Sequence, residues 1–151
     1  MATFISHSPA ETSALGEQWG QEAKPGWVIG LSGDLGAGKT TLVKGIAEAF
    51  QAAAADDVTS PTFTLIHEYR GPQANLYHID LYRIDTPRQL ETLGVDDLIA
   101  DNSILLIEWG EKFQRFERER DVEIALERGN GKLGEPGRNS ENDRRIRITS
   151  K

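Results

Sequence analysis

A glycine-rich stretch followed by a lysine and two threonines carries the clearest chemistry in the sequence. The run GDLGAGKTT satisfies the pattern G-x-x-x-x-G-K-[ST]. In this pattern the glycines let backbone N–H groups turn inward around phosphates, the lysine reaches the β- and γ-phosphates, and the threonine hydroxyl is offered to magnesium. An apolar run precedes the pattern and a helical run follows it, as the motif requires. The sequence therefore predicts a nucleotide-phosphate site formed by Gly33, Asp34, Leu35, Gly36, Ala37, Gly38, Lys39, Thr40 and Thr41.

Two acidic residues are candidates for magnesium binding and for activating water. Glu108 ends the apolar run ILLI, and Asp80 follows the run LYHI. Ligands of α/β proteins bind at the carboxyl ends of strands, where one acid can hold magnesium while the other orients the attacking water. The pattern leaves open which acid has which role. For Asp80, a solvent-facing position in a hairpin strand is an alternative.

Two further residues have an ordinary structural explanation beside a functional one. Trp109 follows Glu108 and either packs over a nucleotide or fills the core. Thr62, in the stretch SPT, either senses a γ-phosphate as switch loops do or is an ordinary turn residue. The residue types alone do not decide between these roles.

The elements that must position these residues alternate between strands and helices. Apolar runs and alternation predict strands, and Ser8-Pro9 and Thr86-Pro87 are typical helix starts. The predicted strands cover residues 3–6, 27–33, 63–70, 76–84, 103–109, 121–128 and 144–150, and the predicted helices cover 9–23, 40–54 and 87–94. We expect one α/β domain over residues 1–151, of the three-layer P-loop NTPase type, with a mainly parallel sheet and some antiparallel strands. Residues 129–143 have no apolar period and are predicted to be a flexible loop.

Composition narrows the class of protein. The chain has no cysteine, so it cannot build disulfides or thiolate metal sites, and His7, His67 and His78 show no ligand spacing. The beginning of the chain lacks a signal-peptide pattern, and the longest apolar run is too short to cross a membrane, so we expect a cytoplasmic protein.

The charge is unevenly distributed. The formal net charge is −7, but residues 128–151 hold seven Lys or Arg and three Asp or Glu, a net +4, which leaves −11 on residues 1–127. An acidic body repels a phosphate backbone. We therefore expect the basic end to be a solvated strand and loop, with a partner or RNA contact as the alternative.

Four stretches in order, GDLGAGKTT, SPTFTL, HIDLYR and LIEWGEKF, resemble the TsaE family of small bacterial ATPases that work with TsaD and TsaB in making threonylcarbamoyladenosine in tRNA. The resemblance runs from about residue 11 to about residue 128. It implies a P-loop α/β fold that hydrolyses ATP with Mg²⁺ and associates with TsaD and TsaB without performing the carbamoyl transfer. It also implies that tRNA contact is indirect or made through the partners, and that the chain alone is a monomer. The site residues it implies are Lys39, Thr40, Asp80, Glu108, Trp109 and, on a switch-like loop, Thr62.

Two other classes of function remain open on the residues alone. In a small P-loop kinase, Arg115, Arg118 and Arg120 would form a lid over the transferred phosphate, although alternating charge is more often a solvated helix. A nucleotide-switched binding module would have negligible turnover. A GTPase is disfavoured, because the sequence has no Asn-Lys-x-Asp segment to read guanine.

Overall fold

The structure, a computed structural model, describes residues 1–34, 36–52, 58, 61, 65–128 and 143–150. Leu35, Thr62 and residues 129–142, for which the sequence makes predictions, lie outside these residues. None of the described helices is both long enough and apolar enough to cross a membrane. Along the chain the elements are β1 (Ala2–Ser6), α1 (Pro9–Gly20), β2 (Val28–Ser32), α2 (Lys39–Ala49), β3 (Ile66–Arg70), β4 (Asn75–Asp80), α3 (Pro87–Leu93), β5 (Ser103–Glu108), α4 (Gln114–Glu119), β6 (Val122–Arg128) and β7 (Arg144–Ser150), with short 3₁₀ helices η2 (Val95–Leu98) and η3 (Gly110–Lys112).

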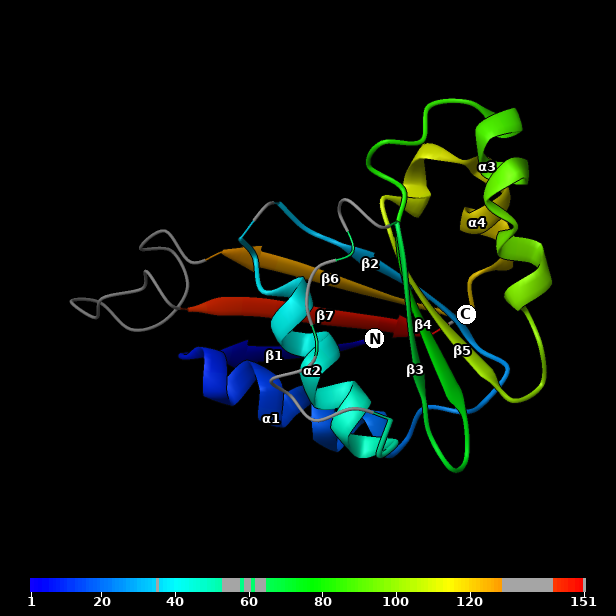
Figure 1. The fold of residues 1–151 in the computed structure, drawn as a ribbon. Coiled ribbons are helices and arrows are strands. Elements are labelled where there is room, and N and C mark those ends of the chain that lie inside the picture. The colour runs from blue at the N-terminus through cyan, green and yellow to red at the C-terminus, as the bar shows by residue number, and fades with distance from the viewer. Residues whose placement is uncertain (35, 53–57, 59–60, 62–64, 129–142, 151) are drawn as a thin grey trace.

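The described strands form a seven-stranded sheet in the order β1-β7-β6-β2-β5-β4-β3 (Figure 1). Strand β2 is parallel to both β5 and β6, and β4 is parallel to β5. The two edges are antiparallel, because β3 pairs with β4 on one side and β7 pairs with β6 and β1 on the other. The predicted α/β fold, with parallel strands at its centre and some antiparallel strands, is confirmed.

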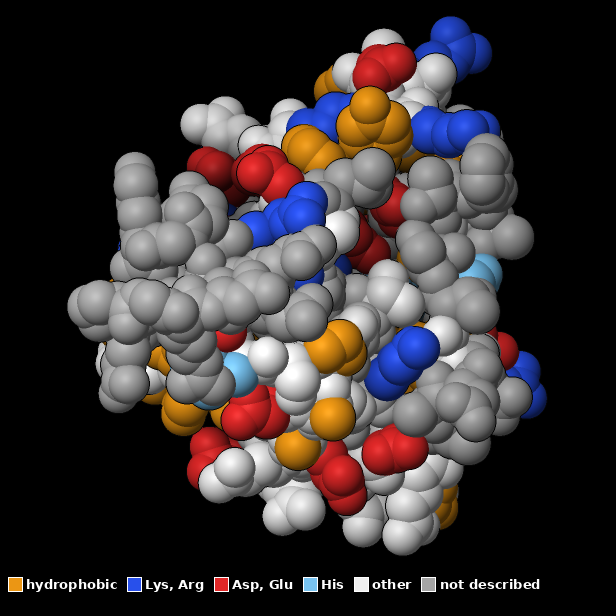
Figure 2. All heavy atoms as spheres, turned by 90° about the vertical axis from the view of Figure 1, so that its left-hand side faces the viewer, with side chains coloured by type: hydrophobic (Ala, Val, Ile, Leu, Met, Phe, Trp, Pro, Cys, Tyr) orange, Lys and Arg blue, Asp and Glu red, His pale blue; other side chains and the backbone are white. Residues whose placement is uncertain are grey.

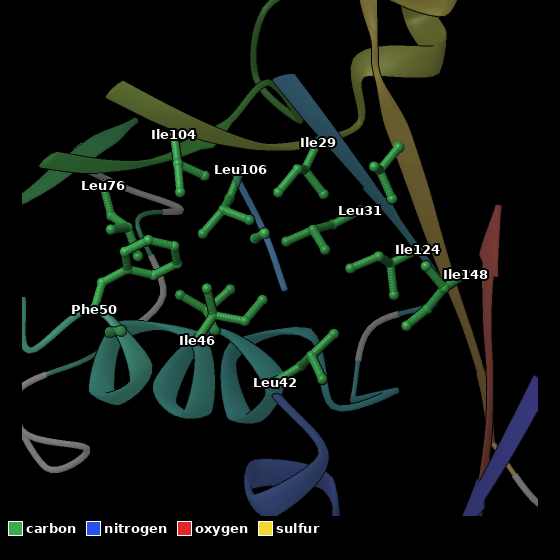
Figure 3. Close-up of a cluster of buried hydrophobic side chains, with 14 of the residues drawn as sticks. Ile29, Leu31, Leu42, Ile46, Phe50, Leu76, Ile104, Leu106, Ile124 and Ile148 are labelled. Carbon is green, nitrogen blue, oxygen red and sulfur yellow. The ribbon is translucent and has the colours of Figure 1, made fainter. Parts of the chain in front are cut away.

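Both faces of the central strands are buried, and this makes the fold three-layered. Ile29 and Leu31 of β2 belong to a core cluster with Leu42 and Ile46 of α2, as Figure 3 shows. Side chains of β5 alternate, so that Leu106 joins this cluster while its neighbours in the strand join a second cluster with α3 and α4. Runs of apolar residues without polar alternation are typical of parallel strands covered on both sides. They explain why the sequence signal for β2 and β5 was strong.

Helix starts follow the sequence closely, whereas several element ends differ from the prediction. The Ser8 side chain accepts a hydrogen bond from the N–H of Glu11 and caps α1, with proline at the first turn. The sequence predicts that the helix after the loop continues to residue 54, but α2 ends at Ala49. Gln51, just beyond its end, has a positive φ of 53°. Strand β4 ends at Asp80, four residues earlier than predicted, because the Asp80 carboxylate accepts the N–H of Tyr82 and turns the chain.

Helices α1 and α2 pack closely enough that only glycine fits at their contact. A Cβ on Gly45 of α2 would lie 1.9 Å from the carbonyl oxygen of Ser13 in α1. On the opposite helix, a Cβ on Gly16 would lie 2.4 Å from the carbonyl oxygen of Leu42. This contact fixes α1 against the helix that follows the glycine-rich loop.

Candidate nucleotide site

The glycine-rich loop joins the carboxyl end of β2 to the first residue of α2, as the sequence predicts. Gly33 has a φ of 146°, and a Cβ there would lie 2.6 Å from the carbonyl oxygen of Leu126, so a larger residue does not fit. Gly38 caps α2 with a φ of 102°. Free N–H groups at a helix N-terminus and the helix dipole favour an anion at this point. The described residues of the loop therefore have the glycine conformations and the helix start that the predicted phosphate site requires.

Lys39 lies across the site and is almost fully buried. Its Nζ donates a hydrogen bond to the carbonyl oxygen of Gly33 at 2.5 Å and lies 3.4 Å from Oε1 of Glu108. The same nitrogen is 5.3 Å from the centre of the Trp109 ring, a cation–π distance. The lysine is thus held between the loop, the acid at the end of β5 and the neighbouring indole.

Asp80 and Glu108 end two adjacent parallel strands at the same level. They are register partners in the pairing of β4 with β5, and each residue is only 4% exposed. The alternative that Asp80 faces solvent in a hairpin is wrong, because the residue is buried at the carboxyl end of β4. Both acids line the same cavity as the glycine-rich loop.

Glu108 also contacts His78, a residue that the sequence analysis did not place in the site. His78 Nε2 lies 2.5 Å from Oε2 of Glu108, and the histidine side chain is fully buried. Burial raises the pKa of Glu108, but the hydrogen bond and attraction of His78, together with Lys39, outweigh it and hold the pKa below its usual value. The two residues are 30 positions apart, so no local motif joins them.

Trp109 lies between the core and the cavity, so the core role is confirmed and packing over a nucleotide stays a prediction. It lines the cavity and also packs against the second core cluster. Its backbone has a positive φ of 64°, which is uncommon for a residue other than glycine and is found mainly at constrained sites. Its ring lies 5.2 Å from that of Tyr82, which is 58% exposed. An aromatic pair therefore borders the acid end of the cavity.

One cavity of about 710 Å³ joins the loop, the acids and the aromatic pair. Figure 2 faces the carboxyl ends of β2 and β6, and it shows acidic side chains deep in a recess above the centre of the view with basic side chains beside it. Of the predicted loop residues that the structure describes, Gly33 and Ala37 do not line the cavity, and Ala37 is buried. The described lining residues are Pro9, Thr12, Asp34, Gly36, Gly38, Lys39, Thr40, Thr41, Asp80, Tyr82, Glu108, Trp109 and Arg144.

Three of these lining residues come from elements that the sequence analysis did not connect with the site. Pro9 and Thr12 lie in the first turns of α1, and Arg144 begins β7 and donates a hydrogen bond to the carbonyl oxygen of Gly36 at 3.2 Å. The strand predicted at the basic end is present as β7, and its Arg145 and Arg147 side chains are 37% and 41% exposed. Arg144, however, reaches the loop, and Ile146 and Ile148 are buried. Asp143, predicted to close a flexible loop, is buried and lies 3.0 Å from His7.

The donor set fits a magnesium ion that is held partly by phosphate. The described residues contain no group of three or more His, Cys, Asp or Glu side chains placed to hold a metal. The cavity does offer the Thr40 hydroxyl and the carboxylates of Asp80 and Glu108, all of them oxygen ligands. Magnesium is usually bound by one or two carboxylates plus substrate phosphates rather than by a protein cage.

The arginines of a kinase-like lid are engaged elsewhere or lie outside the cavity lining. Arg115 donates hydrogen bonds to Asp96, one of them at 3.1 Å, and lies 3.4 Å from Glu119. Arg120 pairs with Glu123 at 2.8 Å. Neither these two residues nor Arg118 are among the described residues that line the cavity. The stretch FQRFERER thus forms the salt-bridged helix that alternating charge favours.

Comparison with known proteins agrees with this geometry. Residues 6–138 match the family model described as "Threonylcarbamoyl adenosine biosynthesis protein TsaE". The chain is similar to the tRNA threonylcarbamoyladenosine biosynthesis protein TsaE of Bacillus subtilis, at 39% identity over 80% of this chain and 74% of that protein. It is 36% identical to the protein of the same name from Aquifex aeolicus, over 97% of this chain and 95% of that one.

The fold is also similar to a solved structure. A crystal structure of Bacillus subtilis YdiB matches with a TM-score of 0.71 and 32% identity, and the match covers 99% of this chain and 84% of that chain. The family match spans the glycine-rich loop, both acids and the tryptophan. By sequence and by fold, the chain belongs to the TsaE family.

Proposed function

We propose that this protein is a magnesium-dependent ATPase of tRNA threonylcarbamoyladenosine biosynthesis, which acts with TsaD and TsaB and does not itself perform the carbamoyl transfer. The observation that carries the proposal is the single cavity that joins Lys39 and Thr40 to two buried acids at the ends of β4 and β5. The names of the relatives support the biosynthetic role. The ATPase activity, the two partners and a cytoplasmic location are our proposals.

Each side chain has a distinct role in this proposal. Lys39 would leave its contacts with Gly33 and Glu108 and bind the β- and γ-phosphates, while the α2 N-terminus and loop N–H groups bind the remaining phosphate oxygens. Thr40 and one of the acids would hold Mg²⁺. When bound, the ion would neutralise negative charge on the phosphates. The other acid would orient the attacking water. Asp80 and Glu108 are both candidates for that step.

Nucleotide binding is tested by thermal unfolding with and without Mg-ATP. At a ligand concentration of about one hundred times Kd, binding to the native state adds about 2.7 kcal/mol to the free energy of unfolding. For a domain of this size we expect the Tm to rise by roughly 5–10 °C. Lys39→Ala should abolish most of this rise. An equal rise in parent and variant, or none in either, would exclude the proposed phosphate site.

Hydrolysis is tested by phosphate release from ATP without an acceptor, with and without TsaD and TsaB. Release identifies an ATPase, transfer that needs an acceptor identifies a kinase, and absence of both leaves a nucleotide-switched binding module. Glu108→Gln and Asp80→Asn keep the shape of the site while removing a charge. We expect the variant that has lost the water-orienting acid to bind Mg-ATP within a few-fold of the parent and to hydrolyse it about 10²-fold more slowly.

Partner binding is tested by measuring association with purified TsaD and TsaB in ATP, in ADP and without nucleotide. A coupling of about 1–3 kcal/mol corresponds to roughly 5–150-fold tighter association in ATP. Thr62→Ala tests the proposed switch loop, because a lost γ-phosphate contact should weaken the ATP preference. Equal affinity in all three conditions would contradict a nucleotide-dependent switch, and absence of association would contradict the partners.

A further inference from the structure

His78 lies behind the acid at the end of β5 and out of reach of solvent. Its side chain is 0% exposed, and its Nε2 is 2.5 Å from Oε2 of Glu108. In the parallel pairing of β4 with β5, His78 is the register partner of Leu106, so its ring reaches forward along β5 to the carboxylate. It does not line the cavity. Any effect of His78 on a bound nucleotide must therefore pass through Glu108.

The contact divides the two oxygens of Glu108. Oε2 is engaged by His78, and Oε1 lies 3.4 Å from Lys39 Nζ at the cavity. An ionised carboxylate only accepts hydrogen bonds, so Nε2 of His78 must carry the proton and donate it. With Oε2 held in this way, Oε1 is the oxygen that remains available on the side of the phosphate loop.

A purely space-filling role explains the position poorly. Among the described residues, Nδ1 of His78 is buried and has no hydrogen-bond partner. A buried polar atom without a partner is costly, and an apolar side chain of similar size would avoid that cost. Leu76 and Ile79, on either side of His78 in β4, are fully buried. Within the part of the chain that the structure describes, the hydrogen bond to Glu108 is the one polar interaction of this ring.

We propose that His78 is a positioning residue, which donates Nε2–H to Oε2 of Glu108 and so directs Oε1 into the nucleotide cavity. The expected effect of His78 on hydrolysis rests on the proposed function. The positioning of the Glu108 carboxylate does not. Hydrogen bonds from outside a site commonly fix the orientation of the groups that act in it. Loss of the donor should let the carboxylate rotate while leaving the phosphate contacts of Lys39 and Thr40 in place.

Two substitutions separate the hydrogen bond from the shape of the ring. His78→Leu removes the donor and keeps an apolar side chain, whereas His78→Gln replaces Nε2–H with an amide N–H at a similar reach. We expect His78→Leu to lower kcat for Mg-ATP hydrolysis by about 10–100-fold, the range seen when such outer contacts are lost. Its Kd for Mg-ATP should stay within about threefold of the parent, since the residue does not touch the ligand. His78→Gln should recover most of kcat.

The matched control is His67, which faces His78 across the antiparallel pairing of β3 with β4 and lies near the Tyr69 hydroxyl instead. His67→Leu should leave kcat unchanged. A second control is a double-mutant cycle that combines His78→Leu with Glu108→Gln. If His78 acts only through Glu108, adding His78→Leu to Glu108→Gln lowers the rate no further.

A crystal structure of His78→Leu without nucleotide gives a readout that does not depend on activity. We expect the Glu108 carboxylate to leave the position in which Oε1 faces Lys39. An unmoved carboxylate, a parental kcat, or an additional loss in the double variant would each overturn the inference. If His78→Leu does not fold, kcat and the crystal structure are measured for His78→Gln instead. Because glutamine keeps an N–H donor, a displaced Glu108 carboxylate in that variant would overturn the inference. A parent that releases no phosphate would refute the proposed function, while the crystal structure still decides the positioning.

Discussion

Gly45→Ala should destabilise the protein, although helix propensity alone predicts the opposite. Alanine in place of a glycine inside a helix gains about 1 kcal/mol. In this structure, however, the new Cβ would lie 1.9 Å from the carbonyl oxygen of Ser13, about 1.5 Å short of the 3.4 Å at which ordinary van der Waals contact begins. Both partners are helix backbone, so neither can turn aside as a flexible side chain would.

The clash would push α2 away from α1, but the opposite face of α2 leaves little room for such a shift. Leu42, Val43 and Ile46 are at most 1% exposed and belong to the core cluster. Figure 3 shows Leu42 and Ile46 facing the sheet. Overpacking of this kind costs about 3 kcal/mol, the upper end of the usual range. Subtracting the gain in propensity leaves a net loss of about 2 kcal/mol, which corresponds to a fall in Tm of about 4–8 °C.

The assay is thermal unfolding followed by circular dichroism, with Gly30→Ala as the matched control. The nearest atom to a Cβ on Gly30 is Cδ of Arg120 at 3.6 Å, an ordinary contact. We expect this control to keep or slightly raise the Tm, because glycine within a strand is about 0.5–1 kcal/mol less favourable than alanine. The Tm rise with Mg-ATP should persist in both variants. A Gly45→Ala protein as stable as the parent would refute the close packing of α1 on α2.

Three smaller effects follow from contacts elsewhere in the molecule. The hydrogen bond from Arg115 lowers the pKa of Asp96, so this pair stabilises the fold above the ordinary carboxyl pKa, and the contribution is lost as the pH falls through the lowered value. Asp96→Asn should therefore lower the Tm by about 1–3 °C at pH 7, a difference that shrinks as the pH falls below the ordinary carboxyl pKa in a pH series of unfolding curves. Thr86→Ala removes the capping box with Gln89 at the start of α3 and should lower the Tm by about 2–4 °C, whereas Thr86→Ser should keep the parental Tm. Chelating Mg²⁺ should remove most of the rise in Tm that ATP causes, and an unchanged rise would argue against a metal at Thr40.

The parts of the site that could be predicted are those with a local signal. The spacing of Gly33, Gly38 and Lys39 together with the preceding apolar run specified a strand, a loop and a helix in that order. The run before Glu108 was apolar at every position, and a strand buried on both faces brings its end to the sheet edge where ligands bind. Each of these signals lies within about ten residues.

Contacts between distant segments could not be predicted in the same way. His78 meets Glu108 because β4 and β5 are neighbours, and nothing in either strand states which strand it pairs with. Arg144 reaches Gly36 only because β7 lies beside β6 and so begins near the loop. The end of β4 was misplaced because the Asp80 carboxylate, rather than a glycine or proline, turns the chain.

The pairing of β1 with β7 has a consequence for the way the chain assembles during its synthesis. Strand β1 is made first but has its partner in β7, and β2 has its partners in β5 and β6, so the sheet cannot form in the order of translation. The apolar side of α2 is not fully covered until β5, β6 and β7 have been made. About 100 residues follow α2 up to the end of β7, and adding them takes roughly 5–20 s at ordinary rates of synthesis. During that interval the nascent chain presents an uncovered helix surface. The candidate site is likewise incomplete until then, because Glu108 of β5 and Arg144 of β7 line its cavity.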